Sequence, residues 1–291
     1  MAGHGVSGGV HTALATPFVE GALDLPAWEG IVARQVRAGV HGIVVAGTTG
    51  ESPTLSGEER DALLRDALEL ARGEQARGKC AVTMGVGTND TRSTIANVER
   101  AQALGADAGL LVLPYYNKPN REGLRAHVRE AAKPGLPLVV YHVPGRTAQR
   151  LSPADLATLC DTEGVVAVKE ATGDLIYGQE FMQRSKCPVL SGDDFTWLPL
   201  LAVGGRGVIS VLSNVAPRRC VAIYDAFCRG DLATAAREHA ALYPVTTYLF
   251  AEVNPVPVKA LMSDMGLCHN EVRLPLWPGA LPDWDLNKDL V

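Results

Sequence analysis

Short apolar runs rich in β-branched residues recur eight times between residues 10 and 211. Several of them, such as residues 43–45 and 165–168, are apolar at every position. A strand that is apolar at consecutive positions is covered on both faces, as the strands of a parallel sheet are. The pattern therefore predicts eight buried parallel strands, at residues 10–16, 42–46, 80–86, 109–113, 137–142, 165–169, 188–191 and 207–211.

The segments between these runs carry helix signals. Ser56 and Glu59 have the spacing of a capping box, and residues 152–153 place a capping serine before a proline. A helical pattern over residues 28–38 ends at Gly39, a typical helix terminator. Strand followed by helix, eight times over, predicts a (β/α)8 TIM barrel, whose usual size is about 250 residues. A doubly wound open sheet stays an alternative, because the pattern does not reveal closure.

The chain continues for about 80 residues after the eighth run, more than one closing helix needs. Residues 217–228, 231–243 and 258–265 have helical patterns, and the last stretch, 274–291, is polar and contains proline. We therefore expect a catalytic barrel over residues 1–215. Residues 216–291 are expected to form a C-terminal helical extension packed on it, with the final stretch along the surface.

Composition narrows the class of protein. The 291 residues carry 27 Lys and Arg against 32 Asp and Glu, and this net charge of −5 argues against nucleic acid as a partner. No apolar run reaches the roughly 18 residues of a membrane helix, and residues 1–10 do not predict a signal peptide. We therefore expect no membrane partner and a cytoplasmic location. The six cysteines lack metal-site spacing, and we expect them to be reduced thiols.

The active site of a barrel lies at the C-terminal ends of its strands, and Lys169 ends the sixth run. Strand alternation puts Lys169 on one face with Ala167 and Val165. If that face points into the barrel, burial there favours the neutral amine, which is the form that makes a Schiff base. The alternative is a lysine that ends a strand and extends to water, and this is the commoner case for a residue taken alone.

Tyr141 is the second candidate, at the end of the fifth run. It alternates in step with Val139, so it can face the interior beside Lys169, where a phenol can shuttle protons. The alternative is a core tyrosine whose hydroxyl bonds to the backbone. His142 has the opposite parity and is expected to pack against the helix layer rather than act in catalysis.

Other polar residues follow the strand ends. Thr48 and Thr49, between glycines, offer hydroxyl and backbone donors for a carboxylate, although a plain turn is the commoner reading. Glu51 can act as a base, but loop carboxylates are usually solvated. Arg146 can clamp a carboxylate or be an exposed loop cation. Residues 193–194 are two aspartates without a third hard ligand nearby, so we predict no metal.

Together these segments closely resemble the dihydrodipicolinate synthase family, also called the 4-hydroxy-tetrahydrodipicolinate synthases, among the pyruvate-dependent class I aldolases. The likeness spans nearly the whole chain, and several motifs in the same order are far more specific than any single one. They are residues 15–18 (ATPF), 47–52 (GTTGES), 114–117 (PYYN), 141–147 (YHVPGRT), 169–173 (KEATG), 191–194 (SGDD), 207–211 (GVISV) and 254–259 (NPVPVK).

The resemblance implies a catalytic set. By it, Lys169 forms an imine with pyruvate, Tyr141 donates and accepts protons, and Thr48 links Tyr141 to Tyr116 in a relay. In the family this last tyrosine comes from a neighbouring subunit, so a dimer completes the site, and a homotetramer, a dimer of dimers, is expected. The resemblance implies no cofactor other than the covalent imine of Lys169 with pyruvate.

The resemblance also implies the substrate contacts. Thr49 binds the pyruvate carboxylate, Ile209 contributes its backbone carbonyl near the imine, and Gly192 lines the pocket. Arg146 holds the carboxylate of L-aspartate 4-semialdehyde, the second small-molecule substrate. The implied product is 4-hydroxy-tetrahydrodipicolinate, in the biosynthesis of diaminopimelate and lysine.

The same resemblance bears on feedback inhibition by lysine. Three positions match the lysine site of inhibited relatives: Ser52, Asn89 and Tyr115. Gly57 and Arg60 stand where strongly inhibited relatives have His, and Ser93 stands where they have Glu. Because a carboxylate that would pair with the amino groups of lysine is missing, we expect weak feedback or none.

Three other functions remain as alternatives. A sister aldolase, such as N-acetylneuraminate lyase or a 2-keto-3-deoxy sugar-acid aldolase, would share the barrel, the lysine and the tyrosine. The Gly-Thr-Thr-Gly-Glu turn together with Arg146 favours the synthase. A non-catalytic barrel would be expected to lack one of the catalytic residues, and a phosphate-binding barrel would want glycines rather than two aspartates after the seventh strand.

Overall fold

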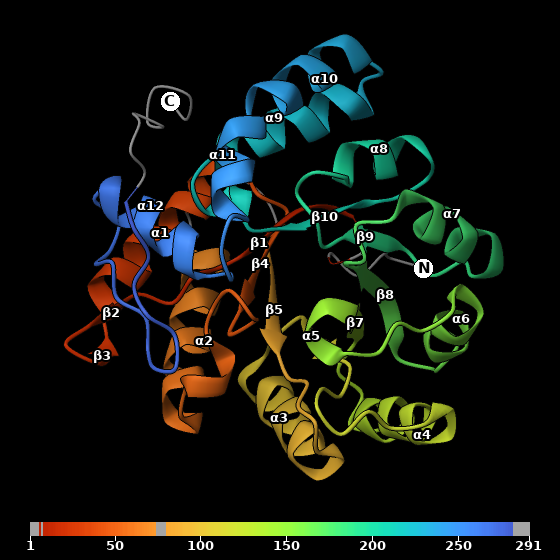
Figure 1. Cartoon of the computed structure of the whole chain (residues 1–291). Coiled ribbons are helices and arrows are strands. Elements are labelled where there is room, and N and C mark those ends of the chain that lie inside the picture. The colour runs from red at the N-terminus through yellow and green to blue at the C-terminus, as the bar shows by residue number, and fades with distance from the viewer. Residues whose placement is uncertain (1–5, 7, 74–79, 282–291) are drawn as a thin grey trace. The chain divides into compact units, whose positions relative to one another are not determined.

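The computed structural model describes residues 6, 8–73 and 80–281. Eight parallel strands form a closed barrel in the order β1-β10-β9-β8-β7-β6-β5-β4, with the elements labelled in Figure 1. The strands are β1 (Gly9–Ala13), β4 (Gly42–Val45), β5 (Ala81–Gly85), β6 (Ala108–Val112), β7 (Leu138–His142), β8 (Val165–Glu170), β9 (Val189–Ser191) and β10 (Gly207–Ser210). The predicted (β/α)8 barrel is confirmed, and the open doubly wound sheet is excluded.

Helices alternate with the strands. They are α1 (Leu25–Ala38), α2 (Gly57–Arg72), α3 (Thr91–Leu104), α4 (Arg121–Ala132), α5 (Pro144–Thr147), α6 (Pro153–Cys160), α7 (Leu175–Arg184) and α8 (Trp197–Ala202). The predicted caps are confirmed. Ser56 and Glu59 form a complete capping box, the Ser152 side chain accepts from the Asp155 N–H, and Gly39 ends α1 with a left-handed φ of 80°.

Four further helices follow β10, namely α9 (Pro217–Cys228), α10 (Leu232–Ala241), α11 (Tyr243–Leu249) and α12 (Val256–Asp264). The single helix predicted over 231–243 is wrong at its end, where α10 stops and α11 begins. Pro244 lies in the first turn of α11, because a proline without an N–H cannot continue the preceding helix. The helix predicted from residue 258 begins earlier, because its first turn accommodates Pro257.

Contacts divide the chain into two compact units, Met1–Gly9 with Ala81–Ile209, and Val10–Cys80 with Ser210–Val291. The boundary predicted between residues 215 and 216 stays a prediction. The last stretch is irregular over residues 274–281, where Leu274 and Trp277 are exposed; the rest of the predicted surface segment lies outside the described residues.

In the first unit, β5 to β10 pair in parallel, and every residue of β7 is buried. This double coverage explains the continuous apolar pattern of the strand. The register pairs Tyr141 with Lys169 and His142 with Glu170. Two residue pairs at the C-terminal ends of β7 and β8 therefore face opposite sides of the sheet.

In the second unit, β1 pairs with β4, and a small hairpin of β2 (Phe18–Val19) and β3 (Ala22–Leu23) precedes α1. The strand predicted over 10–16 ends at Ala13, because the Ala15 N–H donates to the Asn214 side chain, 3.1 Å away, instead of to a strand. The Asn214 amide donates in turn to the Ala13 carbonyl. Residues that follow β10 are thus tied to the end of β1.

Candidate active site

Lys169 and Tyr141 lie side by side at the C-terminal ends of adjacent strands. Each side chain is buried, and the Lys169 Nζ lies 4.2 Å from the centre of the Tyr141 ring. The prediction that the tyrosine lies beside the lysine, one strand away, is confirmed. An amine and a phenol are therefore brought together where a barrel carries its chemistry.

Gly192 makes room for the lysine. A Cβ at this position would lie 2.9 Å from Lys169 Cε and 2.6 Å from the Ala171 Cβ, so a larger residue would displace the lysine stem. The Gly192 N–H donates to the Glu170 carbonyl, which fixes the start of the loop after β9. The predicted pocket residue thus lies directly against the candidate nucleophile.

His142 and Glu170 occupy the opposite face of the same strand ends. His142 stacks on Tyr177 of α7, with ring centres 5.6 Å apart, so its predicted packing against the helix layer is confirmed. Burial, reinforced by the Arg150 charge, lowers the pKa of His142 to about 4. Strand alternation predicts Glu170 on the face opposite to Lys169, but not its environment: its carboxylate accepts from the Thr172 N–H at 2.6 Å, and burial raises its pKa. Only its parity signals this outward position.

The predicted threonine turn follows β4. The Glu51 and Ser52 N–H groups donate to the carbonyls of Thr48 and Gly47, and the Thr16 hydroxyl donates to the Gly50 carbonyl at 2.8 Å. Thr48 is half-buried. Thr49 is buried, and its Oγ1 accepts a hydrogen bond from the Asn254 side chain, at 2.9 Å. The turn therefore has a fixed backbone and one hydroxyl with a defined partner.

Glu51 corrects an expectation. The sequence suggested a base or, more often, a solvated loop carboxylate, but Glu51 is buried and forms an ion pair with Lys259, 2.7 Å from Nζ to Oε1. A carboxylate tied to a buried ammonium is a structural group rather than a free base. The signal that could have found it is Lys259 itself, the last residue of the NPVPVK motif.

The remaining predicted residues take different positions. Arg146 is exposed on α5, the short helix that directly follows β7. Ile209 is buried in β10. Tyr116 is 88% exposed and has a left-handed φ of 71°, so its ring points away from the core of its own unit.

Comparison with known proteins decides the family. The sequence profile described as the dihydrodipicolinate synthetase family matches residues 6–283. The chain belongs to this family.

Its relatives in the family include proteins named 4-hydroxy-tetrahydrodipicolinate synthase. That of Nitratidesulfovibrio vulgaris (strain Miyazaki F) is 45% identical over 93% of this chain and 92% of its own length. That of Leptospira biflexa is 44% identical over 92% of this chain and 90% of its own. The solved structure of dihydrodipicolinate synthase from Thermotoga maritima is 42% identical and covers 94% of this chain and 93% of its own, with a TM-score of 0.89.

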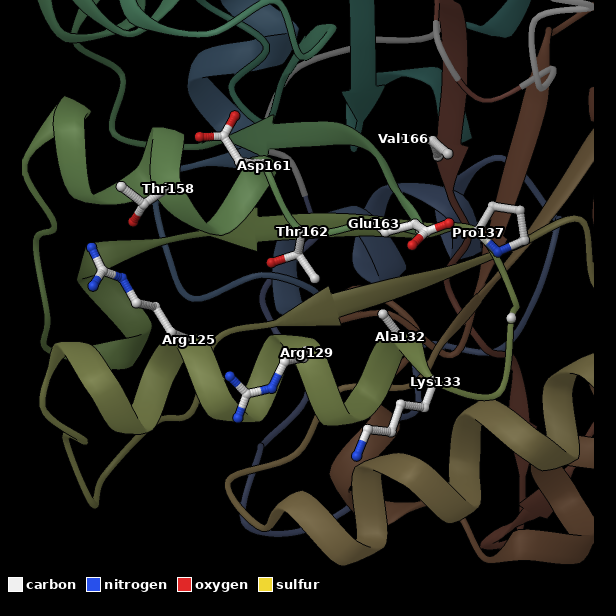
Figure 2. Close-up of a pocket in the computed structure, with 12 residues that line it drawn as sticks. Arg125, Arg129, Ala132, Lys133, Pro137, Thr158, Asp161, Thr162, Glu163 and Val166 are labelled. Atoms are coloured by element: carbon white, nitrogen blue, oxygen red, sulfur yellow. The ribbon is translucent and has the colours of Figure 1, made fainter.

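A cavity of about 900 Å³ lies away from Lys169 and Tyr141, between α4 and α6. Figure 2 shows Arg125 and Arg129 on α4, Lys133 just after it, and Asp161 and Glu163 on the segment that leads from α6 to β8. The cavity borders the N-terminal ends of β7 and β8, whereas Lys169 and Tyr141 lie at the opposite ends. Its cations pair with acids of their own helix, as Arg125 does with Glu122. The cavity is therefore distinct from the candidate active site.

Other classes of site were sought in the described part of the chain. Over residues 6, 8–73 and 80–281, no three His, Cys, Asp or Glu side chains are grouped to hold a metal ion. The Asp193 carboxylate instead accepts from the Phe195 and Thr196 N–H groups and caps its own loop. None of the six cysteines, all of which are described, forms a disulfide. The described helices include none with the length and apolar character needed to cross a bilayer.

Proposed function

We propose that this protein is a 4-hydroxy-tetrahydrodipicolinate synthase, a lyase of the class I aldolase type. It condenses pyruvate with L-aspartate 4-semialdehyde in the biosynthesis of diaminopimelate and lysine. The observation that carries the proposal is the buried Lys169 amine, 4.2 Å from the centre of the Tyr141 ring. Family membership and relatives of this name at about 45% identity support the choice of reaction.

Lys169 is the nucleophile. Its neutral amine attacks the ketone carbon of pyruvate, and loss of water from the carbinolamine gives an iminium ion. The iminium draws electrons from the neighbouring methyl group, which loses a proton to give an enamine. No metal or organic cofactor is needed for this step, because the lysine imine itself is the electron sink.

The enamine carbon then attacks the aldehyde carbon of the second substrate, and the aldehyde oxygen takes up a proton to become a hydroxyl. The amino group of that substrate attacks the iminium carbon, closes the ring and displaces the Lys169 amine. Tyr141 accepts and returns the protons, and Thr48 connects it to Tyr116 in a relay. Hydroxyl groups suit this task because each can both donate and accept a hydrogen bond.

Binding groups surround the reacting atoms. Thr49 holds the pyruvate carboxylate, Gly192 and the Ile209 carbonyl line the imine, and Arg146 binds the carboxylate of the semialdehyde. The contact between Gly192 and the lysine stem supports its place in this set. An exposed guanidinium directly after β7 suits a substrate that arrives from solvent with a carboxylate.

Tyr116 acts in the site of a neighbouring subunit. Its 88% exposure and left-handed backbone support this assignment, because an aromatic ring held outward is available to a second chain. The working enzyme is therefore at least a dimer, and we propose a homotetramer made of two such dimers, in the cytoplasm.

Weak inhibition by lysine belongs to the same proposal. Ser93 donates its hydroxyl to the Asp90 carboxylate, 2.6 Å away, within the cap of α3. The position thus offers an engaged hydroxyl where an inhibited relative would offer a charged acceptor.

Borohydride reduction in the presence of pyruvate tests the proposal. Peptide mass mapping should find the reduced adduct on Lys169 in the natural protein and in the Lys186→Ala variant, whose substituted side chain is exposed. The Lys169→Ala variant should carry no adduct. An adduct on another lysine, or none in the natural protein, would refute the mechanism. Assaying condensation with the semialdehyde against cleavage of sugar acids then separates the synthase from a sister aldolase.

A further inference from the structure

Three contacts join residues 254–279, here called the C-terminal segment, to residues 47–52, here called the threonine turn. Asn254 Nδ2 donates to Thr49 Oγ1 at 2.9 Å, Lys259 Nζ to Glu51 Oε1 at 2.7 Å, and the Arg273 N–H to Glu51 Oε2 at 2.9 Å. The partners are separated by 205, 208 and 222 residues of sequence. Each contact ends on a residue of the turn, so the turn is held from outside its own segment.

The charges in this cluster depend on one another. The side chains of Lys259 and Glu51 are 0% and 1% exposed, so removing either would leave the other as an unpaired buried charge. Lys259 Nζ also lies 4.3 Å from the centre of the Phe18 ring, and the Arg273 guanidinium lies 4.2 Å from the same centre. The Phe18 ring lies against both cations, while Glu51 pairs with the Lys259 ammonium and Glu59 pairs with the Arg273 guanidinium.

The backbone of the turn needs such support. Ala46, just before the turn, has a φ of 50°, and Glu51 has a φ of 55°. This left-handed region is unfavourable for residues with a Cβ, and it persists only where surrounding contacts impose it. Both carboxylate oxygens of Glu51 are engaged by the C-terminal segment, which supplies that restraint.

The contact with Asn254 also sets the direction of a hydrogen bond. The amide N–H₂ of Asn254 can only donate, so Thr49 Oγ1 accepts from it. The hydroxyl proton of Thr49 is then free to point elsewhere. A carboxylate can only accept, so a hydroxyl oriented in this way matches the carboxylate of a 2-oxo acid.

We infer that Asn254 is a positioning residue that prepares Thr49 to donate to the carboxylate of pyruvate, while Lys259 and Arg273 hold Glu51 of the same turn. The inference rests on the proposed function. The C-terminal segment therefore determines affinity for the first substrate without touching the reacting atoms.

Steady-state kinetics of two substitutions at residue 254 test this. In Asn254→Ala the KM for pyruvate should rise about tenfold, as expected for a lost hydrogen bond to a charged group. The kcat and the KM for the semialdehyde should change by less than about twofold, because Lys169 and Tyr141 are untouched. Asn270→Ala, which removes a hydrogen bond to the Gly279 carbonyl in the same segment, is the matched control and should leave every constant unchanged.

Asn254→Asp separates positioning from packing. The substitution keeps the shape, but a carboxylate accepts the Thr49 proton and repels the substrate anion, so the KM for pyruvate should rise at least as much as in Asn254→Ala. A role in packing alone predicts no change. Circular dichroism checks that each variant is folded, and the isosteric variant carries the test if the alanine variant is not.

Wild-type trapping of pyruvate on Lys169 keeps the two proposals apart. If the natural protein forms no adduct, the proposed function fails. If the adduct forms, two results overturn the positioning role of Asn254. In one, both variants keep the natural KM for pyruvate. In the other, kcat falls and both KM values rise together.

Discussion

Among the described residues two lysines are buried, and their surroundings differ. Lys259, in α12, forms an ion pair with Glu51, and at most 1% of either side chain is exposed. Lys169, at the end of β8, lies over the Tyr141 ring, and among the described residues no carboxylate lies within ion-pair distance of it. Both lysines lie over an aromatic ring, but among the described residues only Lys259 is paired with an acid.

The difference corresponds to two uses of the same side chain. Burial lowers the pKa of Lys259 on balance, although the Glu51 carboxylate acts in the opposite direction. The ion pair ties together residues that are 208 positions apart in sequence. Lys169 has no such acid beside it among the described residues, so no ion pair holds its Nζ away from a substrate carbonyl. The partner of each buried lysine thus indicates its use: the ion-paired Lys259 is structural, and Lys169 is the nucleophile of the proposed mechanism.

Replacing each lysine by methionine gives the sharpest test of this comparison. Lys169→Met should lower kcat/KM by at least about 10⁴-fold, because no other amine can form the imine. Its melting temperature should stay near that of the natural protein, because methionine fills similar space and leaves no acid unpaired. A variant with substantial activity would show that Lys169 is not the nucleophile.

Lys259→Met should have its main effect on stability. The free energy of unfolding, measured in urea, should fall by about 3–5 kcal/mol, because the Glu51 carboxylate is left buried without its partner. In the double variant Glu51→Gln, Lys259→Met much of this loss should be recovered, since neither charge then remains. If the double variant is as unstable as the sum of the two single ones, the ion pair does not couple these residues.

Sequence reasoning did better on the first lysine than on the second. Strand alternation places Lys169, Tyr141 and His142 on their correct faces, because the alternation of side chains along a strand is local and has a period of two. The helix caps at Ser56 and Gly39 are local in the same way. These features need no knowledge of distant segments.

The ion pair of Glu51 was not predictable in this way. Its partners lie 208 and 222 residues away, and neither spacing nor periodicity connects them. Isolated loop carboxylates are usually solvated, so the general rule led to the wrong environment. The hydrogen bond between Asn254 and Thr49 is equally remote in sequence, so the support of the turn becomes visible only in the folded chain.

His142 extends the comparison of paired and unpaired buried groups to a histidine. Among the described residues neither of its buried ring nitrogens has a hydrogen-bond partner. Burial and the Arg150 charge lower its pKa from 6.5 to about 4, so the folded protein holds it neutral. Between these values the unfolded chain binds a proton that the folded chain does not, and the stability this group contributes above pH 6.5 is lost as the pH falls toward 4. Lowering the pH from about 7.5 to about 5.5 should therefore cost roughly 1 kcal/mol through this residue.

Urea unfolding of the natural protein and of His142→Asn at both pH values measures this contribution. Glu170, the register partner of His142, acts in the opposite sense, because its raised pKa makes the folded state bind protons more readily as the pH falls. Since both proteins keep Glu170, Arg150 and Tyr177, the difference between their pH slopes isolates the histidine. The natural protein should lose roughly 1 kcal/mol more than the variant on acidification. Equal slopes would mean that His142 finds a proton-accepting partner in solution, and the contrast between paired and unpaired buried groups would then be confined to the two lysines.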